Sequence, residues 1–209
     1  MLIKDLGEFG TLEIINQLIS SSRPVDTDSA QHLLIDSGDD SAGWSPHGTV
    51  ELITTDTVVE GIHFTSESIG WHNLGWKVLA SNISDIASMG ALPSYAVVTL
   101  GLPPHTKIND ITDLYKGMLS IANQYNVSII GGDMVRSDQI FISITLTGTT
   151  TKEPLLRTTA NVGEVVAVTG YLGGSAGGLQ LIQQSIKTNK ASQDYLLTCH
   201  QMPTPQVKS

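Results

Sequence analysis

Acidic residues recur at four places along the chain, in settings that suit a ligand site. They are the pair Asp39-Asp40, then Asp56, Asp85 and Asp133. Most of them sit beside glycine or at the ends of expected strands, and in an open α/β sheet the loops beyond strand ends form the crevice where ligands bind. Magnesium prefers carboxylate, hydroxyl and water oxygens, usually alongside substrate phosphates. Each aspartate alone is more typical of a turn or a helix cap. The four together predict a magnesium site.

Asp85 differs from the others because it lies within an apolar helical pattern, three residues after Asn82 and four before Met89. A carboxylate inside such a helix needs a partner or a cation when it faces the protein. Softer metals are disfavoured, because the six histidines show no paired ligand spacing and Cys199 is the only cysteine. The pattern therefore favours a hard divalent cation.

Phosphate binding would need an unusual design in this chain. The sequence has no Gly-x-x-x-x-Gly-Lys-Ser/Thr loop and no kinase-type glycine loop followed by a strand lysine. The glycine-rich run 173–178 precedes an expected helix, and bare backbone N–H groups at a helix start can approach phosphates. Such runs are more often only turns, so this loop stays an alternative.

Helical and strand patterns alternate along the first three quarters of the chain. Apolar spacing predicts helices over Asn73–Met89 and Ile108–Tyr125, besides one near 10–21. Short β-type runs are expected at His32–Asp36, Glu51–Val59, Tyr95–Leu100, Val127–Ile130 and Ile140–Gly148. This order indicates an α/β or α+β layer built on one sheet, and it leaves open whether the last two strands form a meander.

A polar connection around 153–163 marks the expected domain boundary, which divides the chain into 1–152 and 153–209. A strand at Val165–Thr169 and a helix over Ala176–Ile186 are expected after it. Roughly 50 residues are too few to bury a core of their own. We therefore expect the second part to be the incomplete beginning of a C-terminal α/β domain.

Composition excludes several function classes. Twenty acidic against 11 basic residues give a net charge of -9, which argues against nucleic-acid binding because that requires a basic stripe. No run of about 18 apolar residues could span a bilayer, and the N-terminus lacks the apolar core of a signal peptide. A cytoplasmic location is expected. The single cysteine permits no intrachain disulfide.

Taken in order, the motifs resemble those of the thiamine-monophosphate kinases, within the superfamily of aminoimidazole ribonucleotide synthetase. The motifs are Gly38-Asp39-Asp40, Thr54-Thr55-Asp56-Thr57, Glu60-Gly61-Ile62-His63-Phe64, Asn82-Ile83-Ser84-Asp85 and Gly131-Gly132-Asp133. The resemblance covers nearly the whole chain. It implies a two-domain α/β (PurM-like) fold with a mixed-sheet N-terminal domain.

The resemblance also implies roles for individual residues. ATP and several magnesium ions are expected at the aspartate cluster, with these metal ligands: Asp40, Thr54, Thr55, Asp56, Asp85 and Asp133. Tyr115, Gly132, Asp133 and Arg157 are expected near ATP, and His63 matches the position that meets thiamine monophosphate. The family pattern further implies a homodimer formed through the N-terminal domains.

The activity implied is magnesium-dependent, in-line transfer of the ATP γ-phosphoryl group to thiamine monophosphate, giving thiamine diphosphate and ADP. The acceptor phosphate oxygen is already ionised, so no general base is required and catalysis consists of positioning and charge neutralisation.

The chain departs from the family pattern at several points. It lacks the later Ser-Asp-Gly metal motif, Gln206 follows Pro203-Thr204-Pro205 where an arginine is usual, and Trp44 is bulkier than expected. Two alternatives therefore remain: another ATP-dependent enzyme of the superfamily, or a catalytically silent module for nucleotide binding or dimerisation.

Overall fold

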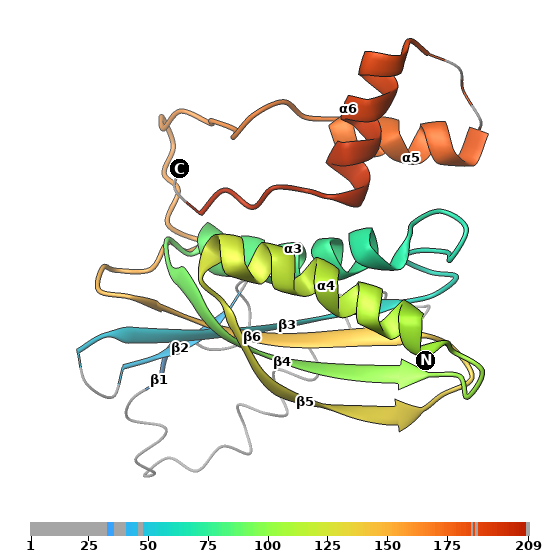
Figure 1. Cartoon of the computed structure of the whole chain (residues 1–209). Coiled ribbons are helices and arrows are strands. Elements are labelled where there is room, and N and C mark those ends of the chain that lie inside the picture. Colours follow the sequence, from blue (N-terminus) through green and yellow to red (C-terminus); the bar gives the residue numbers. More distant parts are fainter. Residues whose placement is uncertain (1–32, 36–40, 46–47, 185, 187, 208–209) are drawn as a thin grey trace, which may run out of the picture.

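The computed structural model describes residues 33–35, 41–45, 48–184, 186 and 188–207. The helix expected near 10–21 and the pair Asp39-Asp40 lie outside the described residues. Within the described part, a mixed sheet carries one layer of helices, and a second helical layer lies over the first (Figure 1).

The sheet has six strands in the order β1-β2-β3-β6-β4-β5. Their bounds are β1 Leu33–Ile35, β2 Ala42–Trp44, β3 Val50–Val59, β4 Leu92–Leu102, β5 Ser128–Arg136 and β6 Phe141–Thr150. All neighbours are antiparallel except β4 and β5, which run parallel and are joined by a helical crossover. The five strands expected between His32 and Gly148 are thereby confirmed in type, and the short β2 was not predicted.

The last of these strands, β6, occupies a central position. It pairs along its whole length with β3, from Val50↔Thr150 to Val59↔Phe141, and on its other side with β4. The meander alternative is wrong, because β6 inserts between β3 and β4 instead of pairing with β5. Every second residue of β6 is buried, which is the alternation expected of a strand with one covered face.

Helices α3 (Trp71–Ser88) and α4 (Ile108–Tyr125) cover one face of the sheet (Figure 1). Two glycines let them touch backbone to backbone. A Cβ atom on Gly75 would lie 1.9 Å from the carbonyl oxygen of Leu114, and one on Gly117 would lie 1.8 Å from that of His72. No larger residue fits at either position without moving a helix. None of the helices in the described part of the chain is long and apolar enough to cross a membrane.

The hydrophobic core lies between these two helices and the sheet. Its largest fully buried side chains are Leu52, Leu79, Ile83, Ile86, Met89, Val98, Leu114, Met118, Ile121, Ile142, Ile144 and Leu146. Burial of about a dozen such side chains, each contributing roughly 1.5–3 kcal/mol, fixes α3 and α4 against β3, β6 and β4. The core therefore holds β3, which carries Thr54 and Asp56, whereas β5, which carries Gly132 and Asp133, has no buried side chain.

The opposite face of the sheet carries both hydroxyl and apolar side chains. Hydroxyl side chains line its centre, where Thr57 donates to Ser143 and Thr145 donates to Thr55. Tyr95 and Ile130 lie towards the β5 edge and are 56% and 63% exposed. Because α3 and α4 occupy the other face, this face is left open among the described residues.

The C-terminal part adds helices α5 (Gly174–Gln184) and α6 (Lys190–Gln201), which lie over α3 and α4 (Figure 1). The chain after α6 is tied to the first layer, since Trp76 Nε1 donates to the Pro203 carbonyl at 2.8 Å and the Tyr125 hydroxyl donates to that of Pro205 at 2.9 Å.

The strand expected at Val165–Thr169 is not formed, which corrects that prediction. Val165 and Val166 are 91% and 93% exposed, and no described strand pairs with the segment. A β-type run becomes a strand only when a partner supplies its hydrogen bonds.

Candidate active site

A partly buried contact between β3 and α3 brings together two of the predicted metal ligands. The hydroxyl of Thr54, a residue that is only 8% exposed, donates a hydrogen bond to Asp85 Oδ2 at 3.0 Å. The pKa of Asp85 is raised from 3.8 to about 6: burial is the largest cause, the Thr54 hydrogen bond acts against it, and the charge of Asp56 adds to it. The ionised form of this carboxylate is therefore disfavoured, and a bound cation would stabilise it.

Asp56 belongs to the same cluster. Side chains two residues apart on a strand share a face, so Leu52, Thr54 and Asp56 all project toward the helices. Asp56 is exposed, whereas the core residue Leu52 is fully buried. The cluster thus begins at the edge of the core and opens toward solvent.

Two buried oxygens beside this cluster have no partner among the described residues. Asn82, one turn before Asp85, is 1% exposed; its amide nitrogen donates to the Val78 carbonyl, but its Oδ1 accepts nothing. Ser41 precedes Ala42, which pairs with Ile53 next to Thr54, and its hydroxyl is also unpartnered. Because buried oxygens are normally satisfied, these atoms fit a hard, oxygen-preferring cation or the water it carries.

Thr55 is directed away from this cluster. Its hydroxyl donates to the Ile144 carbonyl at 3.1 Å and accepts from Thr145 Oγ1 at 3.0 Å. These contacts lie on the open face of the sheet. Asp40, predicted to complete the metal cluster, lies outside the described residues.

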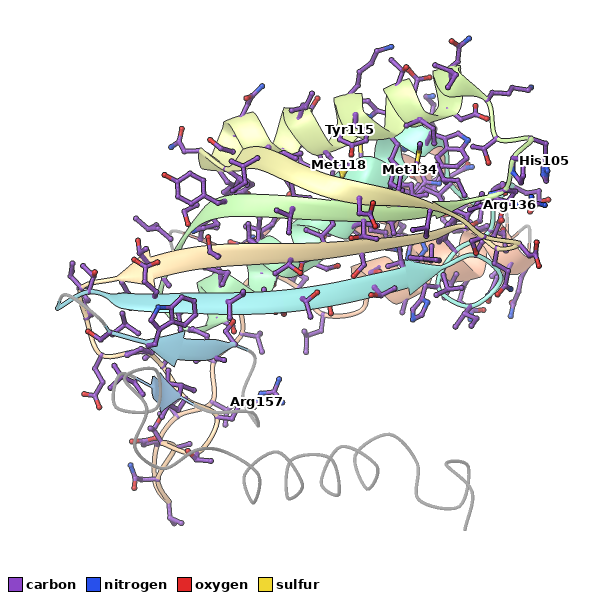
Figure 2. The ribbon with its side chains drawn as sticks, turned by 90° about the horizontal axis from the view of Figure 1, so that it is seen from below. His105, Tyr115, Met118, Met134, Arg136 and Arg157 are labelled. Atoms are coloured by element: carbon purple, nitrogen blue, oxygen red, sulfur yellow. The ribbon has the colours of Figure 1, made fainter. Side chains whose placement is uncertain are left out.

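A second site forms between α4 and β5. Tyr115, Gly132 and Asp133, all predicted near the nucleotide, line a recess of about 370 Å³ together with Leu100, Ile111 and Met134. Figure 2 shows Tyr115 and Met134 close together there. Burial raises the pKa of the Tyr115 hydroxyl. Three of the sequence-predicted residues are thus brought together by the fold.

Gly132 shapes this recess through the backbone. Its φ is 155°, and a Cβ atom there would lie 1.9 Å from the Val98 carbonyl oxygen of β4. Asp133 Oδ1 accepts the backbone N–H of Met134 at 2.8 Å, which fixes the exposed carboxylate at the rim. We expected the acidic residues in loops beyond the ends of strands, but Asp133 lies inside β5.

The structure does not bring Asp133 to Asp56 and Asp85 within one chain. β3 and β5 are separated by β6 and β4, which at a strand spacing of about 4.8 Å amounts to about 14 Å. Among the described residues, no three histidine, cysteine or carboxylate side chains come close enough to share a metal ion.

Arg157 follows β6 and lies far from the recess at α4 and β5. Figure 2 shows it at the opposite edge of the sheet from Tyr115 and Met134. Its role near ATP stays a prediction.

His63 lines a third and larger cavity, of about 490 Å³, between the 61–69 loop, α3, α5 and α6. The backbone N–H of Val59 donates to His63 Nδ1 at 3.1 Å, so the ring hydrogen sits on Nε2. Sequence reasoning missed two other polar residues of this cavity, Lys77 and His200. They are 123 positions apart, and no local pattern joins them.

Comparison with known proteins identifies the family of this chain. Residues 38–150, more than half of the chain, match the AIR synthase related protein, N-terminal domain. The chain belongs to this family. The matched region runs from the first glycine of the predicted motifs to the end of β6, so it includes the β3–α3 cluster and the recess at β5.

Individual family members are similar over most of this chain. A thiamine-monophosphate kinase from Bacillus subtilis is 37% identical over 175 residues, which is 81% of this chain and 54% of the relative. A solved structure of AaThiL complexed with AMPPCP and TMP has a TM-score of 0.86 and 30% identity, covering 99% of this chain and 62% of that one. The crystal structure of thiamine monophosphate kinase from Aquifex aeolicus gives a TM-score of 0.80 and 28% identity over 99% and 63%.

The resemblance read from the motifs is therefore confirmed, as is the α/β fold of the superfamily. The chain spans between about half and two thirds of the length of these relatives.

Proposed function

We propose that this chain carries the ATP- and magnesium-binding part of a thiamine-monophosphate kinase. The observation that supports this most directly is the cluster of Thr54, Asp56 and Asp85 beside an Asn82 oxygen that has no partner among the described residues. All of its donors are oxygens, which is the chemistry that magnesium prefers.

Each predicted group has a distinct task in this reaction. Asp56 and Asp85 would hold magnesium between β3 and α3, with Asp40 as a further predicted ligand. Asp133 would hold metal at the nucleotide. The bound metal would neutralise phosphate charge. Gly132 would let the nucleotide approach the bare backbone of β5, with Tyr115 beside it. The acceptor phosphate is already ionised, so the residues need only hold donor and acceptor oxygens in line.

The similar solved structure named for AMPPCP and TMP supports ATP and thiamine monophosphate as substrates of this lineage. Two acidic clusters on one chain of net charge -9 would repel polyphosphates unless cations intervened. Chelation is therefore expected to abolish turnover. A cytoplasmic location fits the same lineage.

The proposal includes a homodimer formed through the open face of the sheet. Apolar side chains such as Tyr95, Val97 and Ile130 are exposed there, which is unusual for a sheet face without a partner. The separation of Asp133 from Asp56 and Asp85 gives a second reason, since a neighbouring chain could bring one cluster to the other.

The test is formation of ADP and thiamine diphosphate from ATP, thiamine monophosphate and magnesium, measured beside an ATP-binding titration. Asp133→Asn is expected to remove turnover and weaken ATP binding. Asp138→Asn, an exposed aspartate in the next loop, is the matched control and should change neither.

Turnover that survives Asp133→Asn would contradict the assigned role. ATP binding without turnover would favour the silent nucleotide-binding module, and turnover with a different phosphate acceptor would favour another enzyme of the superfamily.

A further inference from the structure

Arg136 is the last residue of β5 and lies just beyond the recess between α4 and β5. Its partner on β4 is Leu102, and the partner of Met134 is Leu100. Both leucines are buried in the core beneath the helices. Paired residues of neighbouring strands project to the same face of a sheet, so Met134 and Arg136 both face the side on which α4 lies.

The side chain of Arg136 continues the row that Met134 begins inside the recess. Two residues along a strand are about 6.6 Å apart, a separation that the long stem of an arginine side chain can span. Figure 2 shows Met134 and Arg136 towards the same end of the sheet. The guanidinium group is therefore within reach of a ligand that fills the recess.

This guanidinium group has no acidic partner in the described part of the chain. Asp133 precedes Arg136 by three residues and Asp138 follows it by two, yet neither forms an ion pair with it. Arg136 is exposed. A guanidinium carries five N–H donors in a fixed fork and no acceptor, so these donors are open to an anion.

The chemistry of the recess separates the parts of a nucleotide. Leu100, Ile111 and Met134 supply apolar walls, and Tyr115 adds an aromatic ring. Such walls suit a base, whereas phosphate groups need charged or N–H partners. Among the described residues that line the recess there is no cationic side chain. Arg136 supplies a cation at the end of these walls.

We propose that Arg136 binds a phosphate group of the nucleotide whose base occupies this recess. The planar fork of a guanidinium matches two phosphate oxygens at once. The inference rests on the proposed function, because it takes the recess as the nucleotide site. It adds a binding residue to those expected from the motifs. Since Arg136 faces the helices, a dimer formed through the open face of the sheet leaves it accessible.

The experiment measures binding of ATP and of adenosine by calorimetry in the presence of magnesium. Arg136→Met keeps a long side chain and removes the charge. It should weaken ATP binding by about 10-fold, the lower end for a charge-assisted hydrogen bond because the group is exposed, and leave adenosine binding unchanged. Arg136→Lys should recover only part of the ATP affinity, since lysine keeps the charge and lacks the fork.

Lys190→Met is the matched control, because it removes one exposed positive charge on α6, where Lys190 pairs with Asp194. It should leave ATP affinity unchanged. Thermal melting of each variant excludes a folding defect. In the native chain, ATP should shift the Nε–H NMR signal of Arg136 and adenosine should not, which decides the case in which adenosine binds too weakly for calorimetry.

Unchanged ATP affinity in Arg136→Met would overturn the proposal, as would an equal loss of ATP and adenosine binding or an Arg136 signal that ATP does not move. If any of these results came with turnover in the native chain, the inference would fail and the kinase would stand. A phosphate-dependent loss in Arg136→Met without turnover in the native chain would leave this contact standing and count against the kinase alone. A native chain that binds no ATP would overturn both.

Discussion

The two acidic sites of this chain are built on opposite principles. At the β3–α3 cluster, Asp85 is half-buried, bonded to a side chain and shifted in pKa to about 6. At the β5 recess, Asp133 is exposed and bonded to its own neighbouring backbone N–H, and the shape is set by a glycine pressed against β4. At the first site burial disfavours the ionised form of a carboxylate, whereas the second site depends on close packing of backbone atoms. Substitutions should therefore change the electrostatic energy at the first site and the packing of the backbone at the second.

The largest effect is expected at Gly132. Gly132→Ala would place a Cβ atom against the Val98 carbonyl in a backbone conformation that disfavours side chains, and should cost about 3 kcal/mol or more in the free energy of unfolding. Urea unfolding measures it. Gly131→Ala is the matched control, since nothing lies within 4 Å of its Cβ position, and should change stability by less than about 0.5 kcal/mol. Equal effects at both glycines would refute the account of the recess.

Magnesium should stabilise the chain through the β3–α3 cluster. At a concentration of about 100 times the dissociation constant, a ligand specific for the folded state contributes about 2.7 kcal/mol. Thermal melting with and without magnesium should show this gain in the native chain. Asp85→Asn should remove most of it, whereas Asp138→Asn should keep it. A gain that is undiminished in Asp85→Asn would place the metal elsewhere.

Without metal, the same carboxylate should make stability depend on pH. The pKa of Asp85 is raised on folding from 3.8 to about 6, so the folded state binds a proton more tightly than the unfolded state. Stability is therefore highest below pH 3.8 as far as this group is concerned, and it falls as the pH rises toward 6.

Because Asp85 is about half exposed, solvent screening reduces the effect to about 1 kcal/mol. Urea unfolding in EDTA at pH 4.5 and 7.5 measures it. Asp85→Asn should lose this fall while retaining the remainder of the pH profile. An identical fall in both proteins would assign the titration to another group.

Whether the sequence predicts a feature of these two sites depends on how far apart along the chain the interacting residues lie. Asp85 could be singled out because it interrupts an apolar helical pattern, whereas Gly132 was singled out only by the resemblance to the family. Helix α4 was predicted with the bounds it has, Ile108–Tyr125. The insertion of β6 between β3 and β4 could not be read, since it depends on pairing across the sheet. For the same reason, the sequence did not predict the separation of about 14 Å between Asp133 and Asp56. The Lys77–His200 contact joins residues 123 positions apart and has no local signal.

The smallest expected effect separates the two hydroxyls at the middle of β3. Thr54→Val removes the hydrogen bond that lowers the pKa of Asp85, so this pKa should rise above about 6. Thr55→Val removes a hydrogen bond on the open face, so it controls for loss of a β3 hydroxyl while leaving Asp85 untouched. Each change should cost about 1 kcal/mol of stability. Carbon-13 NMR titration of the Asp85 carboxyl distinguishes them: a rise in both variants would mean that the pKa responds to the sheet as a whole, and a rise in Thr54→Val alone would fix its control to a single bond.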